Sequence, residues 1–359
     1  MQYRNVDILA QETVADSGTK SIDLDVLDPI TELAVTLDLK NGAAACVAHP
    51  PVDVVTKIEL VDGGTVYASL TGPEAVAMFC YQTGHYPAHW YSETLSENQS
   101  ITIPLRFGRF LGDPLRSFDA SRLRNPQLKI TWAKNALHLT AYVKLAVRAR
   151  IMDGVAGAAS CLLPKAVRTF TTAASGIEPT ELPTDYPIRA LYVRAWLAGA
   201  CPRGILSNFK LDCDEGKFIA FDITGENLQR EIEDIYGYLE VRQNLQTSNA
   251  QKIQAWLGAA YGGYASIAGG AYTTQFWASG NPYGVIYGSD YNAAAFDDQK
   301  VELTSRGSLP HSTFAIPFGL PDDPATWFNA AAYRKVKLNL TQAESDCEAS
   351  IVVQQDRPL

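Results

Sequence analysis

An internal duplication constrains the fold of this chain more than any other feature. Residues 58–72 align without a gap on residues 211–225, and the pairs Leu60/Cys213, Val66/Ile219 and Leu70/Ile223 keep their apolar character. The identical pairs include Gly63 with Gly216, Thr71 with Thr224, and Gly72 with Gly225. Each copy is far longer than the unit of a solenoid repeat. The pattern therefore predicts two consecutive domains that share one fold.

The duplication extends through both copies. Further matches are 29–39 with 187–197, 101–104 with 314–317, Asp113-Pro114 with Asp323-Pro324, and 128–132 with 336–340. The landmarks keep their order while the spacing between them changes, as insertions in surface loops cause. We expect a first domain over residues 1–157 and a second over residues 158–359.

Apolar alternation and β-branched residues predict eight short strands in each copy. In the first copy these are 5–12, 19–26, 30–39, 55–61, 65–70, 100–105, 127–133 and 137–151. In the second copy they are 166–172, 178–182, 188–198, 206–213, 218–223, 312–317, 334–341 and 347–354. A helix follows the fifth strand of each copy, opening at 71–74 and ending near Gln82, and running from Glu226 to about Glu240.

Eight antiparallel strands per copy predict an all-β chain of two consecutive eight-stranded jelly rolls, each a sandwich of two four-stranded sheets. With the strands lettered B to I, the helix of each copy lies in the F–G connection. The second copy carries about 60 additional residues there, roughly Val241 to Arg306, and a loop of that length is usually functional or folded upon itself.

This insertion is rich in Gly, Ala and Tyr, and two interpretations of it stay open. It packs on its own domain through aromatic anchors, or it projects outward and contacts a neighbouring subunit or a receptor, because tyrosine is favoured at interfaces. The candidate contact residues are Trp90, Tyr91, Tyr261, Tyr264, Tyr272, Phe276, Trp277 and Tyr283.

Composition narrows the class of protein. Hydrophobic residues make up 47% of the chain and charged residues 19%, which indicates a folded protein. We expect no membrane-spanning helix, no secretory signal and, from six scattered cysteines, no disulfide framework, so that synthesis in a reducing cytoplasm is expected. The net charge of −9 argues against general binding of nucleic acid.

One segment departs from this acidic balance. Residues 104–150 hold ten Lys and Arg against two Asp, a net charge of +8. The structural, or bland, interpretation is that these residues form a solvated strand face and pair with acidic neighbours. The functional interpretation is that they form a basic edge that meets an acidic subunit edge or an anionic lipid surface. The central members of this basic segment are Arg106, Arg109, Arg116, Arg122 and Arg124.

Few residues suggest catalysis or metal binding. Asp113 and Asp323 each precede a proline and a helix-compatible run (115–123 and 325–333), so both are predicted to cap helices instead of acting as catalytic acids. His85 and His89 are weak candidates for a metal site, since Pro87 between them disfavours a regular helix. Neither a P-loop nor a G-x-S-x-G elbow occurs. We therefore expect no catalytic activity and no cofactor.

Residues 101–114, followed by 125–132, are similar to the G–H region of small phage members of a known family. With two eight-strand domains and a long loop in one copy, the chain resembles the double jelly-roll major capsid proteins of tailless icosahedral DNA viruses, the adenovirus-like and tectivirus-like group. The size resembles the compact prokaryotic-virus end of that family. The resemblance rests on organisation and covers nearly the whole chain.

The resemblance implies a homotrimer with a pseudo-hexagonal outline that tiles an icosahedral shell. It implies that 241–306 forms an exterior tower, that Lys40–Val54 forms a smaller projection, and that the basic segment faces an internal viral membrane. Penton and minor capsid proteins would be further partners, and the protein would reside in the virion capsid after assembly in the host cytoplasm.

Three alternatives stay open. The chain could be a minor capsid or spike protein of the same fold that serves host attachment. It could be a carbohydrate-active enzyme or amidase on paired jelly rolls, with an acidic residue in an interdomain cleft. It could be a lectin-like module whose loop aromatics stack on sugar.

Overall fold

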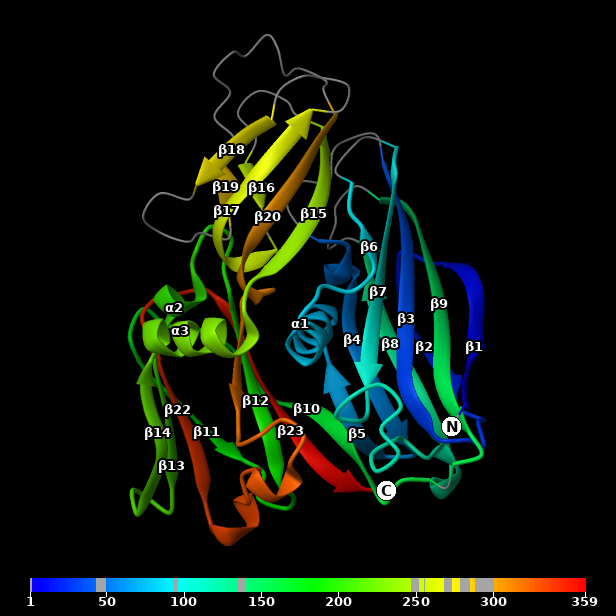
Figure 1. Cartoon of the computed structure of the whole chain (residues 1–359), viewed down its shortest axis with the longest axis vertical. Coiled ribbons are helices and arrows are strands. Elements are labelled where there is room, and N and C mark those ends of the chain that lie inside the picture. The colour runs from blue at the N-terminus through cyan, green and yellow to red at the C-terminus, as the bar shows by residue number, and fades with distance from the viewer. Residues whose placement is uncertain are drawn as a thin grey trace.

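The computed structural model describes residues 2–42, 50–92, 96–134, 140–155, 157–246, 252–254, 256–267, 273–277, 285–287 and 300–359. Two β-sandwiches lie side by side, and a smaller sheet rises above the second one (Figure 1). Both chain ends lie toward the end of the molecule opposite this smaller sheet (Figure 1).

The first sandwich is a jelly roll. One sheet has the order β1-β9-β3-β7, extended by the short β6, and the facing strands have the order β2-β8-β4-β5. With the strands lettered as above, these are the orders B-I-D-G and C-H-E-F. The elements are β1 (Gln2–Val14), β2 (Ser17–Asp23), β3 (Ile30–Asn41), β4 (Val55–Asp62), β5 (Thr65–Leu70), β6 (His89–Trp90), β7 (Asn98–Arg106), β8 (Pro126–Ala133) and β9 (Thr140–Asp153).

The second sandwich repeats this topology. Its sheets have the orders β10-β23-β12-β21 and β11-β22-β13-β14, again B-I-D-G and C-H-E-F. The prediction of two consecutive jelly rolls is therefore confirmed. The elements are β10 (Ser160–Thr171), β11 (Gly176–Leu182), β12 (Ile188–Trp196), β13 (Leu206–Cys213), β14 (Phe218–Thr224), β21 (Thr313–Pro317), β22 (Val336–Gln342) and β23 (Glu348–Pro358).

The core lies between the two sheets of each sandwich. Alternate residues of a strand face inward, and the inward positions are apolar, as Leu33, Val35 and Leu37 of β3 and Leu338 and Leu340 of β22 illustrate; each is at most 1% exposed. The expected domain boundary after residue 157 falls between the end of β9 and the start of β10. That boundary stays a prediction.

The matched Thr-Gly pairs begin equivalent helices, as predicted. Thr71 caps α1 (Gly72–Thr83) in a reciprocal capping box with Glu74, and Thr224 caps α3 (Gly225–Tyr236) by accepting from the N–H of Asn227. Glycine is required after each cap because the helix start approaches a neighbouring carbonyl. A Cβ on Gly72 would lie 2.4 Å from the Val52 oxygen, and one on Gly225 would lie 2.4 Å from the Leu206 oxygen.

This close approach gives a testable prediction. We expect Gly72→Ala and Gly225→Ala each to lower the free energy of unfolding by about 2 kcal/mol, because the methyl group must push backbone apart. Gly64→Ala is the matched control, since a Cβ there meets nothing within 4 Å, and a change within about 0.5 kcal/mol is expected. Urea unfolding measures all three. Equal effects at the three positions would contradict this explanation of the repeated glycines.

The pairing of strands corrects three matches of the sequence alignment. A bulge between Val55 and Lys57 corresponds to one between Leu206 and Asn208, so Ile58 is equivalent to Phe209, not to Leu211. The β7/β21 and β8/β22 matches are likewise out of register by two residues. A shift of two keeps every side chain on the same face of the sheet, which is why the apolar pattern still matched.

The described part of the insertion folds upon itself and forms an antiparallel sheet in the order β15-β20-β17-β18, which we call the tower. Its strands are β15 (Leu239–Gln246), β17 (Leu257–Ile267), β18 (Thr273–Trp277) and β20 (Lys300–Pro310), beside a separate pair, β16 (Lys252–Gln254) and β19 (Val285–Tyr287). The predicted helix end near Glu240 was wrong, whereas the insertion was expected from about Val241, within two residues of the first strand of the tower. Gly237, at φ 70°, ends α3, and the tower begins at Leu239.

Several smaller features differ from expectation. The runs 115–123 and 325–333 are not α-helical, but contain the short 3-10 helices η2 (Ala120–Arg122), η4 (Pro324–Thr326) and η5 (Ala330–Ala332). The short helices α2 (Pro202–Ile205) and η1 (Pro51–Val54) were not predicted. Within the described residues no helix is long and apolar enough to cross a membrane. The cysteines Cys80, Cys161, Cys201, Cys213 and Cys347 are free thiols, while Cys46 lies outside the described residues.

Candidate functional site

The two jelly rolls are joined by backbone into one sheet. Strand β5, at the edge of the first sandwich, pairs in parallel with β10 of the second, with Ser69 opposite Lys165. The result is a continuous eight-stranded sheet that runs from β2 to β21 across both domains. Next to this junction the N–H of Leu162 donates to the Phe107 carbonyl at 2.8 Å. The two domains are thus connected by main-chain pairing as well as by the chain itself.

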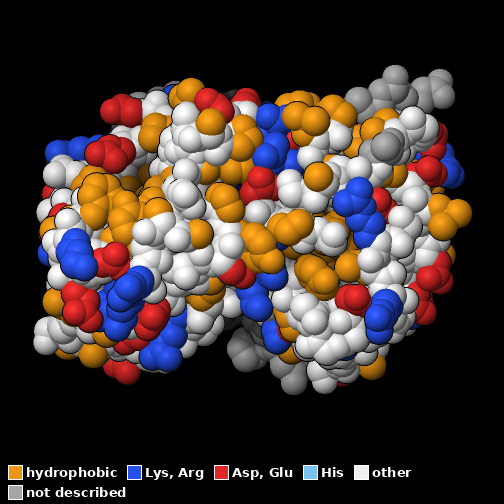
Figure 2. All heavy atoms as spheres, turned by 90° about the horizontal axis from the view of Figure 1, so that it is seen from below, with side chains coloured by type: hydrophobic (Ala, Val, Ile, Leu, Met, Phe, Trp, Pro, Cys, Tyr) orange, Lys and Arg blue, Asp and Glu red, His pale blue; other side chains and the backbone are white. Residues whose placement is uncertain are grey.

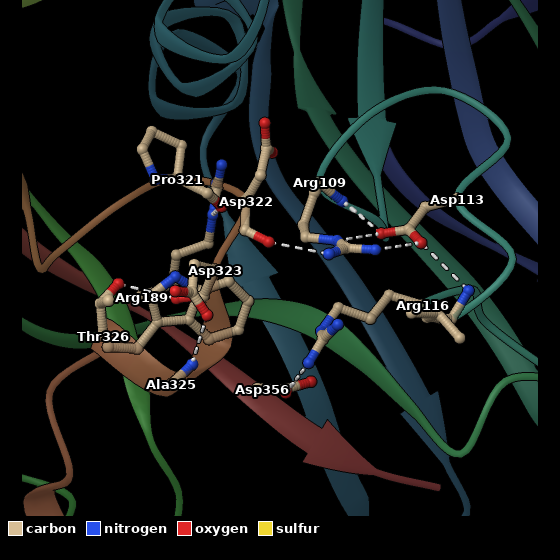
Figure 3. Close-up of polar contacts among 12 residues, drawn as sticks. Arg109, Asp113, Arg116, Arg189, Pro321, Asp322, Asp323, Ala325, Thr326 and Asp356 are labelled. Carbon is tan, nitrogen blue, oxygen red and sulfur yellow. Dashed lines mark hydrogen bonds and ion pairs between the residues drawn. The ribbon is translucent and has the colours of Figure 1, made fainter.

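At the end of this sheet that lies near both chain termini, arginines of the first domain contact residues of the second domain (Figure 3). Arg109 donates to Asp113 through Nε at 2.7 Å and Nη2 at 2.9 Å, and through Nη1 to the Asp322 carbonyl at 2.8 Å. The Asp113 side chain is fully buried. Burial acts to raise its pKa, but the hydrogen bonds from Arg109 and from the N–H of Leu115 outweigh it and lower the pKa below its ordinary value.

Arg116 makes the second contact between the domains. Its Nη2 donates to Asp356 of β23 at 2.7 Å, and its guanidinium lies 4.9 Å from the ring centre of Trp327. The side chains of Arg116 and Asp356 are only 10% and 13% exposed. The pair is therefore largely removed from water, where loss of one partner is costly.

Arg189 supports this joint from within the second domain. It donates through Nε to the carbonyl of Pro321 at 3.1 Å, a residue that Figure 3 shows beside it, and through Nη1 to Gln354 at 3.0 Å. Arg189 thus holds in place the loop whose Asp322 carbonyl accepts from Arg109. Through Gln354, Arg189 also contacts β23, the strand that carries Asp356, the partner of Arg116.

At the other end of the joint, the F–G connection of the first domain packs on the second. Tyr81 of α1 donates to the Thr313 carbonyl at 2.6 Å, and its ring centre lies 4.8 Å from that of Tyr236 in α3. Glu74 of α1 also accepts from the Ser350 hydroxyl of β23. Helix α1 is buried on most of its sides, which fits a helix held between two domains.

His311 occupies the centre of this upper contact. Its Nε2 lies 2.5 Å from the Tyr86 hydroxyl, which is 2.8 Å from the hydroxyl of Tyr91. His311 belongs to a turn in which Leu309, His311 and Ser312 all have left-handed backbone, a conformation that costs non-glycine residues free energy. Burial lowers the pKa of His311 to about 3, so the ring is neutral at pH 7.

The tower is anchored on α3 by a cluster around Glu233. This carboxylate accepts from the hydroxyls of Tyr261 at 2.5 Å and Ser308 at 2.8 Å, and from Gln229 at 2.8 Å. Burial, followed by the hydrogen bond to Glu233, raises the pKa of Tyr261. Sequence reasoning missed Glu233, because one glutamate in a helix carries no signal of what packs on it.

The aromatic candidates separate into three groups. Trp90 is 58% exposed, whereas Tyr91 is 3% exposed and belongs to the upper joint, and Tyr261 is half-buried at the base of the tower. Tyr264 lies on β17, and Phe276 and Trp277 lie on β18, all within the tower sheet. Tyr272 and Tyr283 lie outside the described residues. Contact with a neighbour therefore stays a prediction for the tower residues and for Trp90.

The basic segment is largely paired within the chain, which favours the bland interpretation. Glu32 alone accepts from Arg106 at 2.7 Å and from Arg150 at 3.2 Å. Figure 2, which shows the molecule from below, has Lys and Arg side chains interspersed with Asp and Glu. The other pairs are Arg109–Asp113, Arg116–Asp356, Arg122–Asp119, Lys134–Asp16 and Arg148–Asp7, while Arg124 is exposed and its N–H donates to Asp62.

One of the two predicted helix caps was wrong. Asp323 caps η4, accepting from the N–H of Ala325 at 3.1 Å. Asp113 begins no helix; it binds Arg109, as described above. The cap of the nearby η2 is Asp119 instead. The Asp-Pro pattern could not distinguish the two uses, because both place a carboxylate over free backbone N–H groups.

His85 and His89 form no metal site with other described residues. The Nδ1 of each ring lies near a backbone oxygen, that of Thr83 at 3.2 Å for His85 and that of Pro87 at 2.8 Å for His89. Among the described residues no group of three or more His, Cys, Asp or Glu side chains is placed to hold a metal ion. The metal-ligand role of the two histidines finds no support in this arrangement.

The topology defines a class of fold: two B-to-I jelly rolls, joined through one sheet, with a helix in each F–G connection. No protein-family model matches the sequence, and no curated protein matches it. Solved structures of major capsid proteins do match the fold over 99% of this chain.

Three of these structures illustrate the match. The STIV MCP, from Sulfolobus Turreted Icosahedral Virus, has a TM-score of 0.62 at 13% identity, with 96% of that chain covered. VP54 of PBCV-1 has a TM-score of 0.56 at 12% identity, with 94% of that chain covered. The major capsid protein P2 of bacteriophage PM2 has a TM-score of 0.53 at 12% identity, with 98% of that chain covered. The chain therefore has the double jelly-roll fold.

Proposed function

We propose that this chain is a structural major capsid protein that trimerises into pseudo-hexameric capsomers of an icosahedral virion. The observation that carries the proposal is the fold: both jelly rolls and their connection match solved capsid proteins over 99% of the chain. The function is mechanical, since a shell needs a tile of fixed shape, and neither a cofactor nor a catalytic residue takes part.

The joint described above gives such a tile. The eight-stranded sheet, the Arg109 and Arg116 contacts below it and the His311 contact above it fix the two domains at three levels. Three copies of a two-domain tile place six similar sandwiches around one axis. Closing such a ring requires head-to-tail contacts, and stable contacts bury more than about 1,000 Å² of surface.

The two ends of the tile would have different partners. The tower rises at the end opposite the chain termini (Figure 1), and we assign it to the virion exterior, with Trp90 and the tower aromatics as contact residues. The other end would face the interior and an internal membrane. Penton and minor capsid proteins would complete the shell, assembled in the host cytoplasm. The paired charges of the basic segment support a structural role for it more than lipid binding.

Purified full-length protein tests the proposal. Sedimentation is expected to give a species of three times 39.1 kDa, and raising the concentration is expected to give shells or hexagonally ordered sheets in negative-stain micrographs. A monomer that binds glycans tightly or hydrolyses them would instead support the lectin-like or enzymatic alternatives. A trimer that never forms sheets or shells would favour the minor capsid or spike alternative.

A further inference from the structure

The contact between the two domains of one chain is a head-to-tail contact, because it joins different edges of two similar jelly rolls. It joins the F strand of one jelly roll (β5) to the B strand of the next (β10) in parallel. Because the two domains share one topology, the chain carries a second copy of each strand. The second F strand is β14, and the first B strand is β1.

The pairing of strands fixes which residues are equivalent. A bulge between Asp7 and Leu9 in β1 corresponds to one between Ala166 and Arg168 in β10, so Val6 is equivalent to Lys165. For the two F strands, the bulge between Leu60 and Val61 in the β4–β5 pair corresponds to the bulge between Leu211 and Asp212 in the β13–β14 pair. Residues 65–70 of β5 are therefore equivalent to residues 218–223 of β14, as in the sequence alignment. Asp222 is therefore equivalent to Ser69.

Both remaining strands are edges. Within the described part of the chain, β14 ends the sheet β11-β22-β13-β14 and β1 ends the sheet β1-β9-β3-β7-β6. They lie on opposite sides of the molecule (Figure 1). An edge on one side and its complement on the other is the arrangement that a head-to-tail ring requires.

Strand β14 lacks Pro and Lys, two usual protections of an edge strand, and the bulge it carries is also present in β5, which is paired. Its one charged residue is Asp222. Phe218 and Ile219 are 47% and 44% exposed. Soluble proteins normally blunt a free edge with such residues because an apolar edge pairs with other chains. An edge that lacks both Pro and Lys indicates that another strand covers it.

Comparison of equivalent positions leads to the same conclusion. Ser69 is half-buried against β10, whereas its equivalent Asp222 is exposed. Leu163 and Pro164 of β10 are buried, whereas their equivalents Arg4 and Asn5 of β1 are exposed. Three covered positions of the internal contact are thus exposed at the two free edges, while Val6 and Lys165 are both half-buried.

We propose that β14 of one copy pairs in parallel with β1 of a second copy of this chain, with Asp222 opposite Val6. This inference rests on the proposed trimer and specifies which strands form its interface. The internal β5–β10 contact and the intermolecular β14–β1 contact then alternate around the ring.

Disulfide trapping in the full-length protein tests this register. Residues that pair across a sheet have Cα atoms close enough for a disulfide. Oxidation of the variant Asp222→Cys with Val6→Cys is expected to give covalent dimers and trimers on a denaturing gel, with nothing larger. The matched internal control is Ser69→Cys with Lys165→Cys, which is expected to form its disulfide within one chain and to leave the covalent mass unchanged.

A substitution gives an independent readout. Ile219→Lys is expected to weaken trimer association about tenfold or more, because it places a charge in the paired edge. Ile177→Lys, on the other edge of the same sheet and 62% exposed, is expected to leave association unchanged.

The outcomes separate this inference from the proposed function. The strand pairing would be overturned, with the capsid proposal left standing, by three results together. The wild type is a trimer and the control disulfide forms; the variant Asp222→Cys with Val6→Cys stays uncrosslinked; and Ile219→Lys still trimerises. A monomeric wild type would overturn both. A ladder of species beyond the trimer would overturn the closed ring.

Discussion

Replacing Arg116 with methionine is expected to lower the free energy of unfolding by about 3 kcal/mol. The substitution leaves the Asp356 carboxylate largely buried without its partner, and it removes the contact with the Trp327 ring. Breaking a buried ion pair by deleting one member typically costs about 3–5 kcal/mol. The urea midpoint of unfolding, followed by tryptophan fluorescence, measures the effect.

Two variants act as controls for Arg116. Arg148→Met removes an ion pair whose side chains are 59% and 64% exposed, so its effect is expected to stay below about 1 kcal/mol. Arg116→Met combined with Asp356→Leu removes both charges and is expected to recover most of the loss. Equal midpoints for Arg116→Met and Arg148→Met would show that the contact beneath the joint contributes little.

Acidification below pH 6.5 is expected to destabilise the protein through His311. The pKa of His311 is about 3 in the folded protein, against 6.5 for an ordinary histidine. At pH 7 the ring is neutral in both states and contributes nothing. Between pH 6.5 and about 3 only the unfolded chain binds the proton, so stability falls as the pH falls, by up to about 5 kcal/mol in total.

The surroundings of His311 leave little to offset a charged ring. Arg194 lies close and acts with burial to lower the pKa of His311, as does His89, whose own pKa burial also lowers. Tyr86 stays neutral at these pH values, since burial raises its pKa. Asp53 lines the same small cavity and is the one carboxylate among the described residues that line it.

Urea midpoints at pH 7.5, 6, 5 and 4 test this effect. His311→Gln keeps a hydrogen-bonding group beside Tyr86 and is expected to lose less stability than the wild type as the pH falls. His85→Gln is the matched control, because His85 is exposed, and its pH profile is expected to follow the wild type. Identical profiles for all three proteins would rule out His311 as the acid-sensitive group.

The sequence predicted the jelly rolls well because their signals are local. Alternation marks each strand, and the Thr-Gly caps mark the helices, so element order followed from residues that are neighbours along the chain. The strand register was less certain. Shifting a strand by two residues preserves its alternation, and the bulges that fix the register, such as those at Val55 and Leu206, depend on the partner strand.

The joint between the domains could not be read from the sequence. The excess of Arg in residues 104–150 is visible in the sequence. The partner of Arg116, however, lies 240 positions away, and one partner of Arg109 is the backbone carbonyl of Asp322, which no sequence pattern marks. Asp113 shows the same limit, since its pattern fitted a helix cap while its side chain binds an arginine. The sequence also carries no signal for the burial of His311, because that burial depends on Tyr86 of the other domain.

Cryo-electron microscopy of the purified protein tests the central claim most directly. The proposed capsomer is expected to show three copies of the chain around one axis, six jelly rolls in a near-hexagonal outline, and three towers on one face above alternate sandwiches. A particle with one copy of the chain, or with copies related by a two-fold axis through the same surface, would contradict the assignment of this chain as a capsid tile.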